Sequence, residues 1–296
     1  MKEKKWLIVV LCVLVVAAVV AAVVLLNQPN EKEPEATAAP EATAAPETAE
    51  TAEAAGEEKA LLDVIRERGT VTIAMEGVWQ PWTYHDESGA LTGFDVEVGA
   101  LIAEGLGVKP EYVETDWSAI LAGVDAGRFD MALNGVGYTE ERQKSYNFSS
   151  VYVYTQMVLV VRDDEEEIKT IEDLKGKKTA NSPSSTYAMR AEAAGAEVVY
   201  VDTLGETMEM LQQGRVQATL NDKDSVESYL AEHPEAKIKI AQTVAGEPVA
   251  IPLKKDAATE TLKAEIDRIL QEARDNGKLA ELSVKYFGVD LTTKQD

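Results

Sequence analysis

Residues 203–222 read TLGETMEMLQQGRVQATLND, and they place a helix, a stop and a strand in immediate succession. The stretch Thr203–Gln213 has helical periodicity, and Gly214 ends that helix. The apolar strand Gln217–Asn221 follows, and Asp222 begins another helix. Helices that alternate with single strands in this way are typical of an α/β domain with largely parallel sheets.

The same alternation extends in both directions from this stretch, over about residues 60–286. It is interrupted near 162–168 (RDDEEEI), between two units of about 100 residues each. Ligands of open α/β sheets bind at the carboxyl ends of strands and between domains. The expected helices are 60–68, 94–104, 117–126, 139–146, 185–194, 203–213, 222–232, 258–276 and 278–286. The expected strands are 71–75, 111–114, 130–134, 157–161, 177–181, 197–201, 217–221, 237–241 and 248–253.

Composition excludes several classes of function for this chain of 296 residues. Lys and Arg number 29 against 52 Asp and Glu, a net charge of -23, which argues against a nucleic-acid partner. The single cysteine, Cys12, allows no internal disulfide, and His85 and His233 each stand alone in the sequence. We therefore expect no Cys-rich or His-cluster metal site and no His-based acid–base chemistry. The expectations of no cofactor, no catalytic residue and no enzymatic activity rest in addition on the family resemblance described below.

The amino terminus has the pattern of a membrane segment. Residues 7–26 form an uninterrupted apolar run of 20 residues, preceded by Lys2, Lys4 and Lys5. A helix of that length spans the hydrocarbon core of a bilayer, and the lysines place its start in the cytoplasm. We expect residues 1–27 to be an uncleaved anchor, because the run is longer than that of a signal peptide. A cleaved signal is the alternative.

Residues 28–58 have the composition of a tether. The hexapeptide EATAAP occurs twice, at 35–40 and 41–46, and the segment contains no aromatic or large aliphatic residue. Such a chain buries too little apolar area to offset its ordering entropy, so we expect a disordered Ala/Pro/Glu/Thr linker. It would hold the folded part away from the membrane.

The folded part resembles the type II solute-binding proteins of amino-acid ABC transporters (family 3). The order and spacing of short motifs carry the resemblance, rather than any single motif. Residues 134–139 (NGVGYT) and Asn221–Asp222 are most similar to the cystine and polar amino-acid branch. The motifs are WQPWTY (79–84), GALTGFD (89–95), GRFDMALN (127–134), YTEER (138–142) with FS (148–149), LKGKK (174–178), GRVQATLND (214–222), DNGKL (275–279) and KYFG (285–288).

The resemblance implies a two-lobed type II periplasmic-binding-protein fold with a hinge and an interlobe cleft. Residues 59–161 and 246–290 would form lobe 1, residues 162–245 lobe 2, and residues 291–296 a tail. The lobes would close about crossovers near 158–162 and 244–249.

A free amino acid is a zwitterion, and two residues match its charges. Arg142, about one turn into a helix, suits the carboxylate, which prefers a bidentate guanidinium. The resemblance implies that Asp222 binds the α-ammonium. Asp222 is equally a good helix N-cap, and the two roles are compatible only if different oxygens serve them. Ser185 and Thr186 begin another helix, as carboxylate-binding residues or as simple caps.

The remaining candidates surround the ligand side chain. By resemblance, Trp79 and Trp117 sandwich that side chain, whereas Trp82 is expected to be packing. The family uses backbone groups near Asn134 and Gly137, where glycine allows close approach of the main chain. Glu76 matches a position that contacts the distal end of the ligand.

The expected function is therefore capture of a free amino acid and delivery to an ABC permease. The protein would act as a monomer on the outer face of the cytoplasmic membrane, or would be periplasmic or secreted if its amino terminus were cleaved. The alternatives are a dehydratase-like enzyme on the same fold and an amino-acid-sensing ectodomain. Trp79, Trp117 and Glu76 permit cystine, other polar amino acids or a cationic one.

Overall fold

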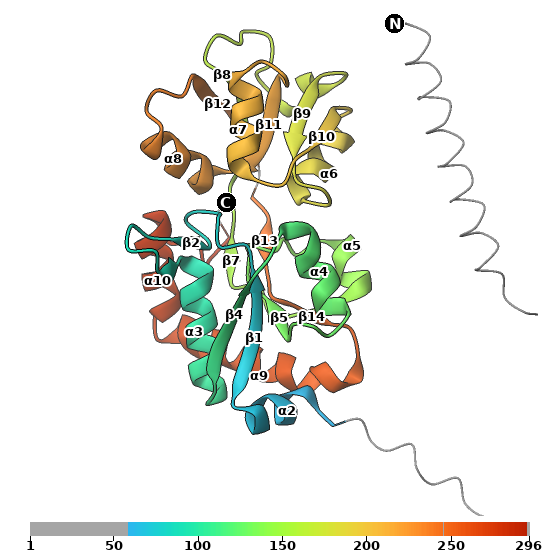
Figure 1. Cartoon of the computed structure of the whole chain (residues 1–296), viewed down its shortest axis with the longest axis vertical. Helices are drawn as coiled ribbons and strands as arrows, with labels where there is room; N and C mark the ends of the chain where they lie inside the picture. The colour runs from blue at the N-terminus through green and yellow to red at the C-terminus, as the bar shows by residue number, and fades with distance from the viewer. Residues whose placement is uncertain (1–58, 245, 295–296) are drawn as a thin grey trace, which may run out of the picture. The chain divides into compact units, whose positions relative to one another are not determined.

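The computed structural model describes residues 59–244 and 246–294, and these contain two main β-sheets, of three and five strands, together with three two-stranded pairs. Each sheet has its own helices, and the segments around β7 (Val153–Tyr154) and β13 (Pro248–Val249) join the two groups (Figure 1). We call the group around the three-stranded sheet the first lobe and the group around the five-stranded sheet the second lobe. The α/β class expected from the sequence is confirmed.

The first lobe is built on a parallel sheet with the strand order β4-β1-β5. Three antiparallel pairs accompany it, namely β2–β3, β6–β14 and β7–β13. The strands are β1 (Thr70–Met75), β2 (Tyr84–His85), β3 (Leu91–Thr92), β4 (Lys109–Glu114), β5 (Met131–Ala132), β6 (Tyr146–Phe148) and β14 (Pro252–Lys254). The helices are α2 (Leu61–Arg68), α3 (Phe94–Leu106), α4 (Trp117–Asp125), α5 (Glu140–Ser145), α9 (Glu260–Asp275) and α10 (Lys278–Phe287), with a 3₁₀ turn at Ala257–Thr259.

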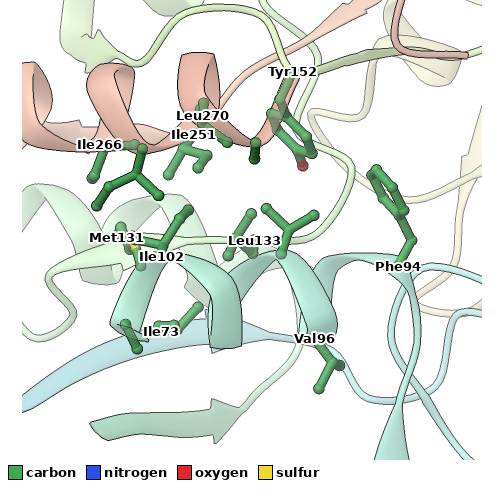
Figure 2. Close-up of a cluster of buried hydrophobic side chains, with 14 of the residues drawn as sticks. Ile73, Phe94, Val96, Ile102, Met131, Leu133, Tyr152, Ile251, Ile266 and Leu270 are labelled. Atoms are coloured by element: carbon green, nitrogen blue, oxygen red, sulfur yellow. The ribbon is translucent and has the colours of Figure 1, made fainter. Parts of the chain in front are cut away.

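The core of the first lobe lies between its sheet and helices α3 and α9. In α9, the buried residues Leu262, Ile266, Ile269, Leu270 and Ala273 recur at the spacing of one helical face. That face packs on the same apolar cluster as Ile102 of α3 and Met131 of β5 (Figure 2). The carboxyl-terminal helices therefore complete a lobe that the amino-terminal strands begin.

The second lobe has the strand order β10-β9-β11-β8-β12. Two further hydrophobic clusters hold helices against this sheet, so its core is separate from that of the first lobe. The strands are β8 (Met157–Arg162), β9 (Lys178–Asn181), β10 (Glu197–Tyr200), β11 (Ala218–Asp222) and β12 (Ile238–Val244). The helices are α6 (Thr186–Ala193), α7 (Leu204–Gln212) and α8 (Lys223–Glu232), with a 3₁₀ turn at Ile171–Leu174.

Strand β8 corrects two expectations. Residues 157–161 were expected in the first lobe, but β8 pairs with β11 and β12 of the second. Both pairings are antiparallel, so this sheet is mixed rather than largely parallel. The physical reason is connectivity, because the chain enters the second lobe along β8 and leaves it along the adjacent β12.

We propose that the crossovers between the lobes are residues 155–156 and 245–247, which connect β7 to β8 and β12 to β13. Thr155 of the first crossover and Glu247 of the second are close together, since the backbone N–H of Thr155 donates to the carbonyl of Glu247 at 2.9 Å. A Cβ at Gly246 would lie 1.7 Å from the carbonyl oxygen of Thr155, so this contact requires glycine. The second crossover was expected near 244–249, whereas the first was expected near 158–162, a stretch that lies within β8.

The expected membrane helix and linker, residues 1–58, lie outside the described residues. Within the described ranges, no helix is both long enough and apolar enough to cross a membrane.

Candidate functional site

A cavity lies between the two lobes, with about 620 Å³ of space free of protein atoms when its opening to solvent is included. The carboxyl ends of β1, β9 and β11 contribute residues to its wall, as expected for ligand sites in α/β folds. Eight of the nine residues predicted from the sequence line it, and Asp222 lies directly beside a lining residue, Asn221. The eight are Glu76, Trp79, Trp117, Asn134, Gly137, Arg142, Ser185 and Thr186.

Arg142 is the buried cation of the cavity. It lies in α5, where its backbone N–H donates to the side chain of the N-cap residue Thr139. Its guanidinium donates from Nη1 to the carbonyl of Gly137 and from Nη2 to the carbonyl of Ser184, each at 3.0 Å. Burial lowers the pKa of Arg142, and the negative charge of Glu247 opposes that shift. These two bonds use two of five side-chain N–H donors, so the others can bind an anion.

Asp222 is the N-cap of α8, and its two oxygens have different surroundings. Oδ1 accepts the backbone N–H groups of Asp224 and Ser225 and, at 3.5 Å, the indole N–H of Trp82. Oδ2 is buried and has no hydrogen-bond partner in the described part of the chain. Burial raises the pKa of this carboxyl, and the charge of Asp224 raises it further. One oxygen therefore caps the helix while the other can accept a hydrogen bond from a ligand.

Arg142 and Asp222 both act on one side chain of the cavity wall, Tyr187. The charge of Asp222 raises the pKa of Tyr187 and that of Arg142 lowers it, although burial is the largest cause of the upward shift. The cation and the carboxyl are therefore both near the same phenol.

Glu76 and Asn134 form a reciprocal pair at the ends of β1 and β5. The Glu76 backbone N–H donates to Asn134 Oδ1 at 2.9 Å, and Asn134 Nδ2 donates to Glu76 Oε2 at 2.7 Å. Burial raises the pKa of Glu76 to about 7, and the charges of Asp116 and Asp202 add to the rise. Glu76 can therefore bind ligand groups either as a carboxylate or as an acid near neutral pH.

The three tryptophans of the site have different contacts. Trp79 lines the cavity and stacks on the fully buried Trp82 at 5.5 Å between ring centroids. The expectation that Trp82 is a packing residue is confirmed, since it also contacts Phe94 and Phe287. Trp117 lines the cavity, but its ring lies over the guanidinium of Arg142, with Cζ 5.3 Å from the ring centroid.

Ser185 and Gly137 lie in the region where the two lobes approach each other. Ser185 is the N-cap of α6, because its Oγ accepts the backbone N–H of Ala188 at 3.1 Å. A Cβ on Gly137 would lie 2.9 Å from Cγ2 of Thr186 and 3.2 Å from Oε2 of Glu247. The lack of a side chain at Gly137 therefore allows the first-lobe loop to approach the second lobe closely.

The sequence reasoning missed several lining residues of the second lobe, among them Asn181, Asp202 and Asn221. Asn181 and Asn221 are in the last residues of β9 and β11, and Asp202 follows β10. The rule that ligands bind at the carboxyl ends of strands would have found them, whereas Asp222 was selected by the family resemblance. Asn181 Nδ2 donates to the carbonyl of Leu220, whereas its buried Oδ1 has no partner in the described part of the chain.

Among the described residues, no group of three or more His, Cys, Asp and Glu side chains is placed to hold a metal ion. The site is instead made of one cation, several carboxyls, amides and aromatic rings, which suits a small polar organic ligand.

Comparison with known families agrees with this geometry. Residues 71–289 match the family model of the bacterial extracellular solute-binding proteins, family 3. The chain belongs to this family. The curated relatives of this solute-binding protein are named as amino-acid- or L-cystine-binding proteins, in agreement with the prediction that it is not an enzyme.

Three relatives show how close the likeness is. A probable amino-acid ABC transporter-binding protein of Haemophilus influenzae is 39% identical over 78% of this solute-binding protein and 90% of its own length. An ancestral arginine-binding protein bound to arginine is 33% identical, with a TM-score of 0.70 over 75% of this chain and 99% of the other. The unliganded, open L-cystine receptor of Neisseria gonorrhoeae is 39% identical, with a TM-score of only 0.54 over 79% and 99%.

Of these two solved structures, the arginine-bound one has the higher TM-score, although its sequence identity to this chain is the lower.

Buried carboxyls predict that the stability of the protein without ligand falls as the pH rises. Burial raises the pKa of both Asp95 and Glu76 to about 7 from ordinary values near 4. Between about pH 4 and pH 7 the native state keeps protons that the unfolded chain has released, so raising the pH favours unfolding. We expect the melting temperature to be lower at pH 8 than at pH 5 by at least about 3 °C.

Asp95→Asn provides the matched control for this prediction. Asp95 accepts the backbone N–H of Gly135 at 2.6 Å and the hydroxyl of Tyr152 at 2.7 Å. The asparagine oxygen can accept the Gly135 N–H and its NH₂ group can donate to the hydroxyl oxygen of Tyr152, and neither group titrates. The variant should show a smaller fall between the two pH values, and a melting temperature that rises from pH 5 to pH 8 would contradict the prediction.

Proposed function

We propose that this chain is the extracytoplasmic substrate-binding component of an amino-acid ABC importer. It captures a free amino acid between its two lobes and delivers it to the permease, and it acts as a monomer anchored by its amino terminus. One observation carries the proposal: the interlobe cavity is lined by a buried guanidinium with spare donors, and beside its wall one buried oxygen of Asp222 has no hydrogen-bond partner in the described part of the chain.

The two charged groups suit the two ends of an α-amino acid. Arg142 would bind the carboxylate through its remaining N–H donors, assisted by the N-terminus of α6 at Ser185 and Thr186. Oδ2 of Asp222 would accept the α-ammonium while Oδ1 continues to cap α8. A ligand held in this way touches both lobes, so it favours the closed arrangement.

The ligand side chain would lie beside Trp79, Trp117, Asn134 and Glu76, with Gly137 providing close backbone contact. Cystine or another polar amino acid fits an aromatic wall that carries a polar pair. The names of the relatives support the same class, since they include binding proteins for L-cystine and for L-arginine.

Thermal-shift screening over the free amino acids and cystine tests the proposal. A ligand present at 100 times its dissociation constant should stabilise the native state by about 2.7 kcal/mol. We expect a clear rise in melting temperature for a small group of polar amino acids and none for their decarboxylated amines. A screen in which no free amino acid raises the melting temperature would refute the proposal.

A further inference from the structure

Besides the long bond from Trp82 to Asp222, two hydrogen bonds of 3.0 Å join the lobes through protein atoms alone. The indole N–H of Trp117 donates to the carbonyl of Pro183 at 3.0 Å. The guanidinium of Arg142 donates to the carbonyl of the next residue, Ser184, also at 3.0 Å. Both donors belong to the first lobe, and both acceptors belong to the turn between β9 and α6 of the second lobe.

The two donors are themselves held together. The guanidinium of Arg142 lies under the ring of Trp117 at 5.3 Å, within the range of a cation–π contact. The ring also packs against the buried first-lobe clusters that include Ile120 and Val136. Trp117 is therefore fixed to its own lobe by its ring and reaches the other lobe through its N–H group.

The acceptor turn has an unusual backbone. Ser184 has a φ of 59°, the left-handed region, and it is the sole non-glycine residue with a positive φ in the described part of the chain. Residues other than glycine adopt this conformation at a cost, and such strain persists where the surrounding contacts hold it in place. Here the contacts on either side of the strained residue are those made by Trp117 and Arg142.

We propose that Trp117 is a positioning residue that holds the lobes closed, acting through Pro183 and Arg142 rather than chiefly as a wall for the ligand side chain. We call Trp117, Arg142, Pro183 and Ser184 the latch. Because the two bonds between lobes involve protein atoms alone, the latch strengthens the binding of every ligand by the same factor. Its effect on affinity rests on the proposed function, but its effect on lobe closure does not.

Trp117→Phe is the direct test, because it keeps an aromatic ring over Arg142 and removes the indole N–H. Loss of one neutral hydrogen bond should weaken binding by about 3- to 10-fold. Calorimetry with several amino acids that bind the wild type should show nearly the same factor for each. A change in the ranking of ligands would overturn the proposal, since it would identify Trp117 as a specificity wall.

Ser184 offers a matched pair of variants, because its side chain is not part of the cavity wall. Ser184→Gly keeps both carbonyls and tolerates the positive φ, so its affinity should equal that of the wild type. Ser184→Pro cannot adopt a positive φ, so it displaces the turn and should weaken binding as Trp117→Phe does. If thermal melting shows that both variants are folded, equal affinity of the glycine and proline variants would overturn the latch.

Lobe closure can be measured separately from affinity. Spin labels at Glu87→Cys of the first lobe and Glu172→Cys of the second, both exposed positions, would report the interlobe distance in the full chain with Cys12→Ser. Without added amino acid, Trp117→Phe should shift the distance distribution toward longer values. An unchanged distribution would refute the latch, even if no amino acid were found to bind and the proposed function had failed.

Discussion

Replacing Arg142 with alanine should abolish amino-acid binding measured by calorimetry, with a loss of affinity of more than about 100-fold. The guanidinium is the buried cation of the cavity, at 7% exposure, and its neighbours Gly137 and Ser184 offer only carbonyl oxygens to it. In the variant, a ligand carboxylate that enters the cavity still loses its hydrating water, but it no longer meets the buried positive charge of Arg142. The variant also removes one of the hydrogen bonds between the lobes, which adds to the effect.

Two further variants make this experiment decisive. Arg190 is an arginine on helix α6 whose side chain is exposed. The variant Arg190→Ala should therefore bind with the affinity of the wild type. Arg142→Lys keeps the charge but not the planar fork, so it should remain at least about 10-fold weaker than the wild type. If thermal melting shows that Arg142→Ala is folded, near-wild-type affinity of this variant would refute the assignment of the carboxylate site.

Asp222→Asn should separate binding from stability. Asparagine is as good an N-cap as aspartate, so the hydrogen bonds to the backbone N–H groups of Asp224 and Ser225 should persist. The position of Oδ2, however, can become an NH₂ group, which cannot accept a hydrogen bond from an α-ammonium. We expect a loss of affinity of more than about 100-fold in calorimetry.

The same variant should unfold at an equal or higher temperature than the wild type at pH 8. Burial raises the pKa of Asp222, so ionising it in the native state is unfavourable, and the amide removes that cost. Asp256→Asn is the control, because Asp256 also caps a short helix, through the N–H of Thr259, but lies outside the cavity wall. Wild-type affinity of Asp222→Asn would show that the α-ammonium binds elsewhere.

Most of the candidate site was predictable because its residues follow local rules. Arg142, Ser185 and Asp222 are at or near helix starts that the sequence marks by caps, and Asn134 is at a strand end. Asn181 and Asn221 also lie at the ends of strands, but the strand-end rule was not applied to them. Their place in the cavity depends on which strands are adjacent, and the order β10-β9-β11-β8-β12 is not encoded in any short stretch.

The boundary between the lobes could likewise not be predicted from short stretches of the sequence. The apolar stretch Met157–Arg162 was recognised as a strand from its composition, but its partners were not. It pairs with Ala218–Asp222 and with Ile238–Val244, and both pairings are antiparallel. Periodicity reports which face of an element is buried, whereas pairing between distant strands depends on the packing of the whole lobe.

The sequence by itself determined the alternation of helices and strands, the order of the motifs and the pair of charges suited to a zwitterion. These features depend on residues close together in the chain, such as Gly214 ending a helix before a strand. Only the tertiary structure decided what Trp117 does. Its ring lies over Arg142 and its N–H reaches Pro183, which is 66 residues away in sequence. No local pattern encodes that contact, because it forms only when two separately folded lobes come together.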